Sequence, residues 1–247
     1  MDSPGYILLS RLALQSRATQ VLANNIANAD TPGFRAQHPL FAAHLHRLGA
    51  MPVPGGSTAA YVQDRATWRE RRPGAVQTTS NPLDIALGAD GYLAVETPRG
   101  ERYARAGRLS LAPDGRIVDL EGHAVLGTTG TPIAVAAGDT RIEILGDGTV
   151  RSENGVLGRL RVVRFDRPDR LLAEGNRLFH PDGEEPRPVE QPQITQGAFE
   201  GSNVSAVVEI TRLTAEMREF QLAVQFADRE SERITTAIER ILRRRGA

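Results

Sequence analysis

The architecture of this chain follows from residues 206–241, which read AVVEITRLTAEMREFQLAVQFADRESERITTAIERI. Apolar or small residues recur there at steps of four and three, over about five heptads, with charged residues between them. The pattern predicts a helix of about 38 residues, roughly 57 Å long. A stripe of that length outruns a small β-domain, so we expect a partner helix. The alternative is a terminal helix folded on that domain. The predicted seam comprises Ile210, Leu213, Met217, Phe220, Val224, Ile234, Ile238 and Ile241.

A second helical pattern lies at the other end of the chain, between about residues 4 and 28, and is the natural partner. Its seam is Leu8, Leu12, Gln15, Thr19, Leu22 and Ile26. Two of these six residues are polar, so the pattern is weak alone. Because both seams carry small or polar residues, we expect the ends to be loosely ordered in the monomer and to gain order against neighbouring subunits.

The centre of the chain changes to short apolar runs separated by turn residues, which predicts an all-β domain. Leu83–Leu87 and Tyr92–Val95 are expected strands, joined by a hairpin turn at Asp90–Gly91. Turns are also expected at Pro113–Gly115 and Asp147–Gly148. The predicted fold is a mainly β central domain inserted between N- and C-terminal α-helices that pair as a coiled-coil-like module. Composition divides the chain into a helix and motif segment at 1–48, a linker or extended segment at 49–80, the β-domain at 81–190, and the connector and C-terminal helix at 191–247.

Composition excludes several classes of function. The 247 residues contain no cysteine, which excludes thiolate metal sites, and no lysine, which excludes a phosphate-binding GxxxxGK[ST] loop and a Schiff base. Thirty basic and thirty acidic residues balance, so no nucleic-acid partner is expected. No apolar run approaches the roughly 20 residues that span a bilayer, so no membrane insertion is expected. The N-terminus lacks the basic segment of a cleaved signal peptide.

Catalytic and metal-binding patterns are also missing from the sequence. There is no G-x-S-x-G, H-E-x-x-H or dinucleotide fingerprint. His38, His44 and His46 do not have a strong metal-binding spacing, and no carboxylate lies among them. We therefore expect no enzyme activity, no catalytic residue, no metal and no cofactor.

The most specific motif is ANNIANADTPGF at residues 23–34. Asn and Asp side chains bond nearby backbone and so end helices, while Pro32 cannot continue a helix and Gly33 permits a left-handed turn. Phe34 would anchor the outgoing chain. A helix stop alone does not explain three asparagines within five positions. The candidate assembly residues are Asn24, Asn25, Ile26, Asn28, Thr31, Pro32, Gly33 and Phe34.

This motif resembles the N-terminal signature of the bacterial flagellar rod and hook proteins. Residues 81–95, NPLDIALGADGYLAV, resemble the central motif of the longer members, and YARAGRL at 103–109 resembles the segment that follows it. EGSNV at 200–204 resembles the start of the C-terminal helical region, where Ser202 or Asn203 could cap the helix. The length and the reading TPGFRAQ favour the proximal-rod branch over the distal-rod branch and the longer hook proteins.

The resemblance implies a structural subunit without enzyme activity. Such proteins are exported unfolded through the flagellar type III apparatus without a cleaved signal, and they polymerise helically into the rod, a drive shaft that crosses the periplasm within the basal body. The terminal helices would form the inner tube wall. The implied partners are other rod subunits, copies of the same chain and the export apparatus. Phe41 and Leu45 have the F-x-x-x-aliphatic spacing of an export-gate recognition element.

Two alternatives stay open. The first is a distal-rod or hook-like axial protein of the flagellum. The remote one is a small β-sheet hydrolase with helical oligomerisation arms, which would require polar residues to converge in one pocket of the β-domain.

Overall fold

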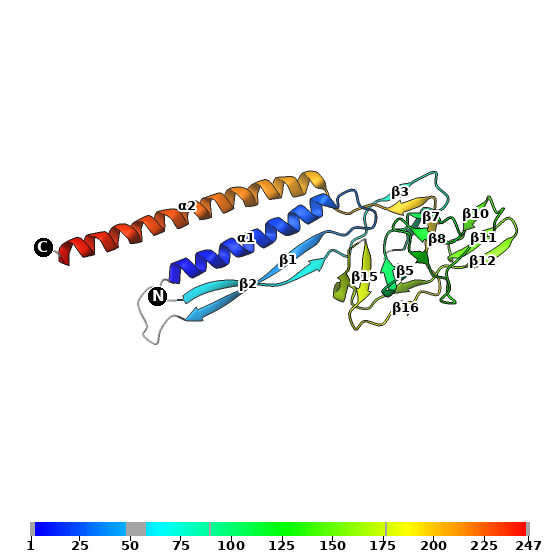
Figure 1. Ribbon diagram of the computed structural model, residues 1–247, viewed down its shortest axis with the longest axis horizontal. Helices are drawn as coiled ribbons and strands as arrows, with labels where there is room; N and C mark the ends of the chain where they lie inside the picture. Colours follow the sequence, from blue (N-terminus) through cyan, green and yellow to red (C-terminus); the bar gives the residue numbers. More distant parts are fainter. Residues whose placement is uncertain (1–2, 48–57, 89, 176, 246–247) are drawn as a thin grey trace. The chain divides into compact units, whose positions relative to one another are not determined.

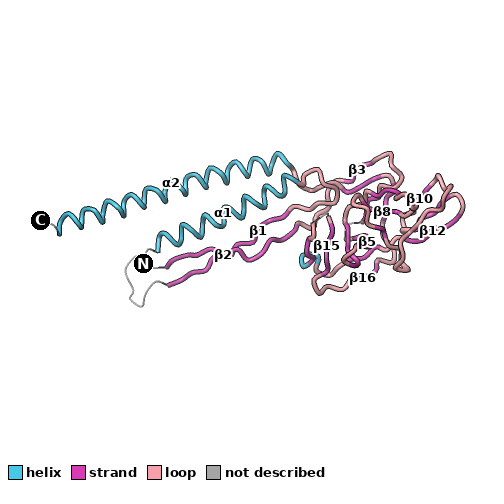
Figure 2. Tube along the Cα trace, viewed as in Figure 1, coloured by secondary structure: helices cyan, strands magenta, loops and turns pink. Residues whose placement is uncertain are grey.

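The computed structural model describes residues 3–47, 58–88, 90–175 and 177–245. It is mainly β, with one α-helix near each end of the chain, which confirms that part of the predicted fold (Figures 1 and 2). The chain divides into two compact units that alternate along the sequence. Unit 1 contains residues 1–27, 37–68 and 205–247, and unit 2 contains residues 28–36 and 69–204.

Unit 1 consists of two helices and a pair of strands. Helix α1 (Ser3–Ala27) contacts both helix α2 (Ala206–Arg245) and strand β1 (Gln37–Arg47), and β1 pairs with β2 (Thr58–Arg69). Figure 1 shows α1 between α2 and the two strands. The guanidinium of Arg17 on α1 bonds β2, with 3.2 Å from Nε to the carboxylate of Asp64 and 3.0 Å from Nη2 to Thr67 Oγ1.

The two helices run antiparallel and differ in length. Arg11 of α1 lies 3.7 Å from the carboxylate of Glu219 of α2, and nearer the other end of the pair Asn25 bonds Glu209. Beyond the Arg11–Glu219 pair, α1 continues for about 12 Å and α2 for about 39 Å, at about 1.5 Å per residue. The last turns of α2 therefore extend past the N-terminal end of α1, as Figure 1 shows.

Unit 2 is built from short antiparallel strands. They are β3 (Val76–Thr78), β4 (Ile85–Leu87), β5 (Tyr92–Thr97), β6 (Gly100–Ala104), β7 (Leu109–Leu111), β8 (Ile117–Asp119), β9 (Ala124–Val125), β10 (Ile142–Ile144), β11 (Thr149–Ser152), β12 (Gly155–Arg159), β13 (Val162–Arg164), β14 (Leu171–Ala173), β15 (Leu178–Pro181), β16 (Arg187–Pro188), β17 (Ile194–Gln196) and β18 (Ala198–Glu200), with a 3-10 turn at Pro168–Arg170.

The largest sheet has the order β14-β15-β6-β5-β9-β8-β7, and β13 pairs with both β5 and β16. A three-stranded sheet, β10-β11-β12, and two strand pairs, β17-β4 and β18-β3, complete the unit. The pairs β17-β4 and β18-β3 join segments from opposite ends of the central region, because Ile194 lies opposite Leu87 and Glu200 opposite Val76.

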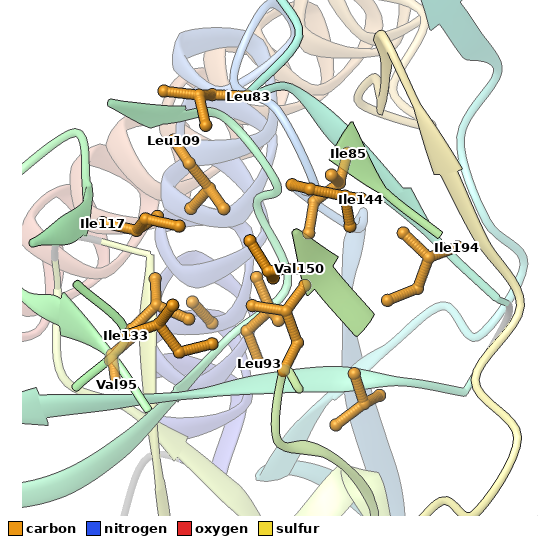
Figure 3. Close-up of a cluster of buried hydrophobic side chains, with 14 of the residues drawn as sticks. Leu83, Ile85, Leu93, Val95, Leu109, Ile117, Ile133, Ile144, Val150 and Ile194 are labelled. Carbon is orange, nitrogen blue, oxygen red and sulfur yellow. The ribbon is translucent and has the colours of Figure 1, made fainter. Parts of the chain in front are cut away.

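Side chains of β5 alternate between two apolar clusters, as the two-residue period of a strand requires. Leu93 and Val95 enter the larger cluster, where Ile85, Ile117 and other aliphatic side chains point toward one another (Figure 3). Tyr92 and Ala94 enter the second cluster, which is rich in aromatic rings. That cluster comprises Tyr92, Ala94, Tyr103, Leu126, Val163, Phe165 and Leu171, with Phe179 packed against it. The strand is buried on both faces because each face meets its own core.

The turn predictions had mixed outcomes. The turns expected at Pro113–Gly115 and Asp147–Gly148 are confirmed: they join β7 to β8 and β10 to β11, and Gly115 and Gly148 have a positive φ. The hairpin predicted at Asp90–Gly91 is wrong. A turn is present, since Gly91 N–H donates to Gly88 O, but β4 pairs with β17 while β5 pairs with β6, β9 and β13.

Strands β1 and β2 were not expected, because the sequence there lacks a clean strand period. The stretch LFAAHLH in β1 places two alanines and two histidines among its apolar residues, and the following Gly- and Pro-rich segment resembles a linker. Pairing with another strand and contact with α1 stabilise β1 where local propensity is weak.

Glu153 should titrate far below an ordinary glutamate. Its carboxylate accepts hydrogen bonds from the Thr140 backbone N–H at 2.8 Å, from Thr140 Oγ1 at 3.0 Å and from the Arg141 N–H at 3.0 Å. These bonds, that of the Thr140 N–H above all, lower the pKa of Glu153 from 4.5 to about 2. Because the folded pKa is depressed, the stabilisation is complete above pH 4.5 and is lost as the pH falls toward 2. A carboxyl NMR titration checks this, and a midpoint near 4.5 would contradict it.

Candidate functional site

The N-terminal motif is divided between the two units. Asn24, Asn25 and Ile26 lie in the last turns of α1, whereas Asn28 to Phe34 belong to unit 2. In the second part, Thr31 N–H donates to Asn28 O at 3.1 Å and Thr31 Oγ1 bonds Asn28 Oδ1 at 3.2 Å. The motif therefore ends the helix, as predicted, and then forms a turn.

Asn25 is fully buried, and both the oxygen and the nitrogen of its side-chain amide form hydrogen bonds within unit 1. Its Oδ1 accepts the backbone N–H of Gln37 at 2.9 Å, and its Nδ2 donates to Gln37 O at 2.9 Å. Nδ2 also donates to Glu209 Oε2 at 3.1 Å. An amide is needed here because one end must accept and the other must donate twice.

Glu209 is the counterpart of Asn25 on α2. It is only 5% exposed, and its second oxygen accepts a 2.8 Å hydrogen bond from Arg212 Nη1. Asn25 and Glu209 together therefore connect α1, the start of β1 and the first turn of α2.

A second cluster, the Glu200 cluster, is defined by Arg35, Arg105 and Glu200 of unit 2, all buried. Arg35 Nε lies 3.4 Å from Glu200 Oε1, and Arg105 Nε lies 2.9 Å from Glu200 Oε2. Arg105 Nη2 also contacts that oxygen. The Gly74 N–H donates to Oε1 at 3.3 Å. One carboxylate thus receives donors from three separate segments of the chain.

The remaining donors of Arg105 bond backbone carbonyls at the end of β4 and in the loop that follows it. Nη1 donates to Gly88 O at 2.7 Å and also to Gly91 O, and Nη2 lies 3.3 Å from Leu87 O. Burial lowers the pKa of Arg105, while the neighbouring Glu200 carboxylate opposes that shift. The carbonyl dipoles and the carboxylate compensate a guanidinium that has been removed from water.

Hydrogen bonds to backbone groups join nearby segments of unit 2. Gly33 N–H donates to Glu200 O at 2.8 Å, and Ala36 N–H donates to Asn203 Oδ1 at 2.7 Å. Asn203 also donates from Nδ2 to Arg72 O at 2.8 Å. The predicted helix cap at Ser202 or Asn203 is therefore wrong: α2 begins at Ala206, and the Asn203 amide is occupied by the chain at residues 36 and 72.

Replacing Gly33 by Ala should destabilise unit 2. Gly33 has φ +69°, and a Cβ there would lie 2.9 Å from backbone atoms of Arg105 and Ala106. We expect the free energy of unfolding to fall by about 1–3 kcal/mol. Gly122→Ala is the matched control, because Gly122 has φ +87° but no atom within 4 Å of the added Cβ. Equal losses in urea unfolding of the two variants would contradict the close approach at Gly33.

The predicted seam of α2 is largely exposed in the single chain. Ile210, Met217, Phe220 and Ile234 are 50, 52, 39 and 40% exposed, and Leu213 and Val224 are half-buried. Among the α2 residues whose side chains the structure describes, the buried ones are instead Glu209 and Ala223, each one residue before a seam position. The side chains of Ile238 and Ile241 lie outside the described residues.

The other predicted elements are placed as follows. Phe41 on β1 is 37% exposed, while the side chain of Leu45 lies outside the described residues. The ring of His38 stacks on Trp68 with centroids 4.7 Å apart, and the side chains of His44 and His46 are outside the described residues. Within the described part of the chain, no three potential metal ligands lie together. Nor is any helix found there long and apolar enough to cross a membrane.

One open cavity of about 840 Å³ in unit 2 is relevant to the hydrolase alternative. Its lining contains Asp147, Arg159 and the segment Glu190–Thr195. Arg159 donates to the backbone carbonyls of Asp147 and Glu190. The lining residues of this cavity include no serine or histidine, so it offers no nucleophile–histidine pair.

Known families match along most of the chain. The Flagella basal body rod protein family matches residues 6–35, the Flagellar hook protein FlgE/F/G D1 domain matches residues 86–152, and the Flagellar basal body rod FlgEFG protein C-terminal family matches residues 195–240. The first and third matches include the Asn25 and Glu200 segments described above.

Individual relatives agree with these families. The chain is 32% identical over 242 residues to the flagellar basal-body rod protein FlgF of Caulobacter vibrioides, with 98% of both chains covered. It is 35% identical to FlgF of Escherichia coli, covering 91% of this chain and 92% of that protein. It is 31% identical to FlgG of Agrobacterium fabrum, covering 91% of each. The chain therefore belongs to the flagellar basal-body rod protein family and is a FlgF-like member of it.

Proposed function

We propose that this protein is a non-enzymatic subunit of the proximal rod, which polymerises helically through its terminal helices as part of the drive shaft for bacterial motility. Membership in the rod protein family supports the rod assignment. The observation that carries the mode of assembly is the exposed apolar stripe on α2.

The stripe has the spacing of a coiled-coil seam. Ile210, Met217 and Val224 repeat every seven residues, and Leu213 and Phe220 lie between them. Fully burying one such side chain stabilises a contact by about 1.5–3 kcal/mol. We propose that α1 and α2 form a coiled-coil-like module whose remaining apolar surface, continuing to Ile234, Ile238 and Ile241, is covered by helices of neighbouring subunits. The neighbours are copies of this chain and other rod subunits.

The N-terminal motif would support this assembly by fixing where the helices begin and end. In this proposal Asn24, Asn25 and Ile26 hold the end of α1, while Asn28, Thr31, Pro32, Gly33 and Phe34 direct the chain into unit 2. The terminal segments would be loosely ordered in the free monomer and gain order on assembly. We propose the same four segments for this subunit: the helix and motif at 1–48, the linker or extended segment at 49–80, the β-domain at 81–190, and the connector and C-terminal helix at 191–247.

We further propose that the chain reaches the rod, within the periplasm, through the flagellar type III apparatus and without a cleaved signal. Phe41 and Leu45 would form the element that the export gate recognises. Export would act on the unfolded chain, in which both side chains are accessible.

Met217→Glu should abolish motility while leaving the monomer folded. A charge at this exposed position disturbs little in the single chain but would be buried in the assembled rod. Leu222→Glu is the matched control, because Leu222 is 65% exposed on the same helix but about 140° around the axis from Met217. Swimming assays and electron microscopy of basal bodies are the readouts. Normal rods with Met217→Glu would contradict the proposed seam.

A distal-rod position is the second candidate, favoured by the 31% identity to FlgG of Agrobacterium fabrum. Labelling the protein with gold in purified basal bodies separates the two positions. Label at the distal end, next to the hook, would favour the distal-rod assignment.

A further inference from the structure

Helix α1 contains a second buried amide, Gln15, which differs from Asn25 in having no hydrogen-bond partner. Its side chain is only 7% exposed, and neither Nε2 nor Oε1 is bonded by any of the residues that the structure describes. Asn25, on the same helix, has three such bonds. The single chain therefore satisfies one buried amide of α1 and leaves the other unsatisfied.

An unsatisfied buried amide weakens the packing around it, because it has lost water without gaining another partner. An apolar side chain of similar size at residue 15 would pack there without this penalty. Polar residues at core positions of helical assemblies lower stability but specify register and partner. Gln15 has this character: it occupies a position of the predicted α1 seam, three residues after Leu12 and four before Thr19.

The surroundings of Gln15 are held by weak contacts. Arg11, one turn before it, pairs with Glu219 at 3.7 Å, and both side chains are about 60% exposed. Arg17, just after it, pairs with Asp64 at 3.2 Å, and both are about 40% exposed. Exposed ion pairs of this kind contribute little to the stability of the folded state. Around Gln15, α1 is therefore less firmly attached to α2 and β2 than it is at Asn25.

We propose that Gln15 is a specificity-determining residue for assembly: its amide finds its hydrogen bonds in a second copy of this chain, when α1 repacks against the helices of the neighbour. The unsatisfied amide keeps the helical module of the free chain easy to open, and in the assembled state it selects the register in which a polar group faces it. The second copy is the expected occupant because α2 presents Ile210, Met217 and Phe220 as an exposed apolar stripe in the same module. The inference rests on the proposed function of rod assembly.

Gln15→Met tests the inference, because methionine matches glutamine in length and in helix propensity but has no amide. In the isolated full-length protein, we expect hydrogen exchange of the α1 backbone amides to slow by about five- to a hundredfold. Gln15→Leu is a second variant for the same measurement. Asn25→Leu is the matched control and should accelerate exchange, since it removes an amide whose bonds are all made.

The same Gln15→Met variant should reduce motility and the number of assembled rods in cells. Unchanged or faster exchange would overturn the inference, since it would show that the amide is already satisfied in the monomer, for example by a buried water. Slower exchange with normal rods would also overturn it, because the amide would then have no role in assembly. Failure of the proposed function itself is seen separately, if a strain lacking the whole gene still swims.

Discussion

Glu200→Gln is expected to lower the free energy of unfolding of unit 2 by about 3–5 kcal/mol, the range for breaking a buried ion pair from one side. The variant keeps the shape of the side chain but removes the charge that compensates two buried guanidinium groups, those of Arg35 and Arg105. Every group around the carboxylate is a donor, including the Gly74 N–H. Whichever way the glutamine amide is turned, its NH₂ group would therefore face another donor in place of an acceptor.

Glu174→Gln is the control for this prediction. Glu174 also bridges two arginines of unit 2, at 3.1 Å to Arg99 Nη1 and 2.8 Å to Arg102 Nε, but its side chain is 21% exposed and that of Arg99 is 60% exposed. Because water screens the exposed Glu174 and Arg99 side chains, we expect a clearly smaller loss than for Glu200→Gln. Urea unfolding followed by the NMR amide signals of β5 measures both variants. Equal losses would show that burial does not set the strength of the Glu200 cluster.

The fold of unit 2 depends on residues from both ends of the chain, since Arg35 follows the N-terminal motif and Glu200 precedes the C-terminal helix. A protein that ends at residue 199 loses the carboxylate that compensates the buried guanidinium groups of Arg35 and Arg105, whereas one that ends at Val204 keeps Glu200 and Asn203 with their partners. We expect the longer truncation product to retain the fold of unit 2 and the shorter one to lose much of it. A truncated protein that is used to test rod assembly should therefore keep the chain up to and including Val204.

Features with a local signal could be predicted from the sequence. The heptad spacing gave α2 almost to its observed end at Arg245, and Asp-Gly pairs located the turns at Gly115 and Gly148. The left-handed conformation of Gly33 followed from its place after Pro32. In each case a few adjacent residues determine the backbone, so no knowledge of the rest of the chain is needed.

Contacts between distant segments could not be predicted in this way. Arg105 and Glu200 are 95 positions apart, and nothing in the residues around either one specifies its partner. The heptad pattern likewise predicted a helix without telling which side is covered: Glu209 and Ala223 are buried, although neither is in the apolar seam. A carboxylate becomes a core residue of α2 only because Asn25 and Arg212 bond it. The one signal available was the excess of asparagines near residue 25, which marked the place but not the contact.

Asn25→Asp is expected to destabilise unit 1 by roughly 3–5 kcal/mol, the range for a buried charge without a partner. The introduced carboxylate has nearly the same shape as the amide but cannot donate to Gln37 O or to Glu209. It also places a second negative charge about 3 Å from the carboxylate of Glu209, in a site that water does not reach. Asn24→Asp is the matched control, because Asn24 is exposed on the same turn of α1.

The effect of Asn25→Asp should depend on pH in a direction that distinguishes it from loss of packing. Burial and the nearby Glu209 raise the pKa of the introduced carboxyl in the folded state above its unfolded value. The variant therefore binds a proton more readily when folded, and its destabilisation is complete above the raised pKa and shrinks as the pH falls through that value. The protonated carboxyl can also donate one hydrogen bond again. Thermal unfolding can be followed by the fluorescence of Trp68, which is the only tryptophan and lies in unit 1. A loss that stays constant between neutral pH and pH 5 would show that shape, and not charge and donor count, makes asparagine necessary at this junction.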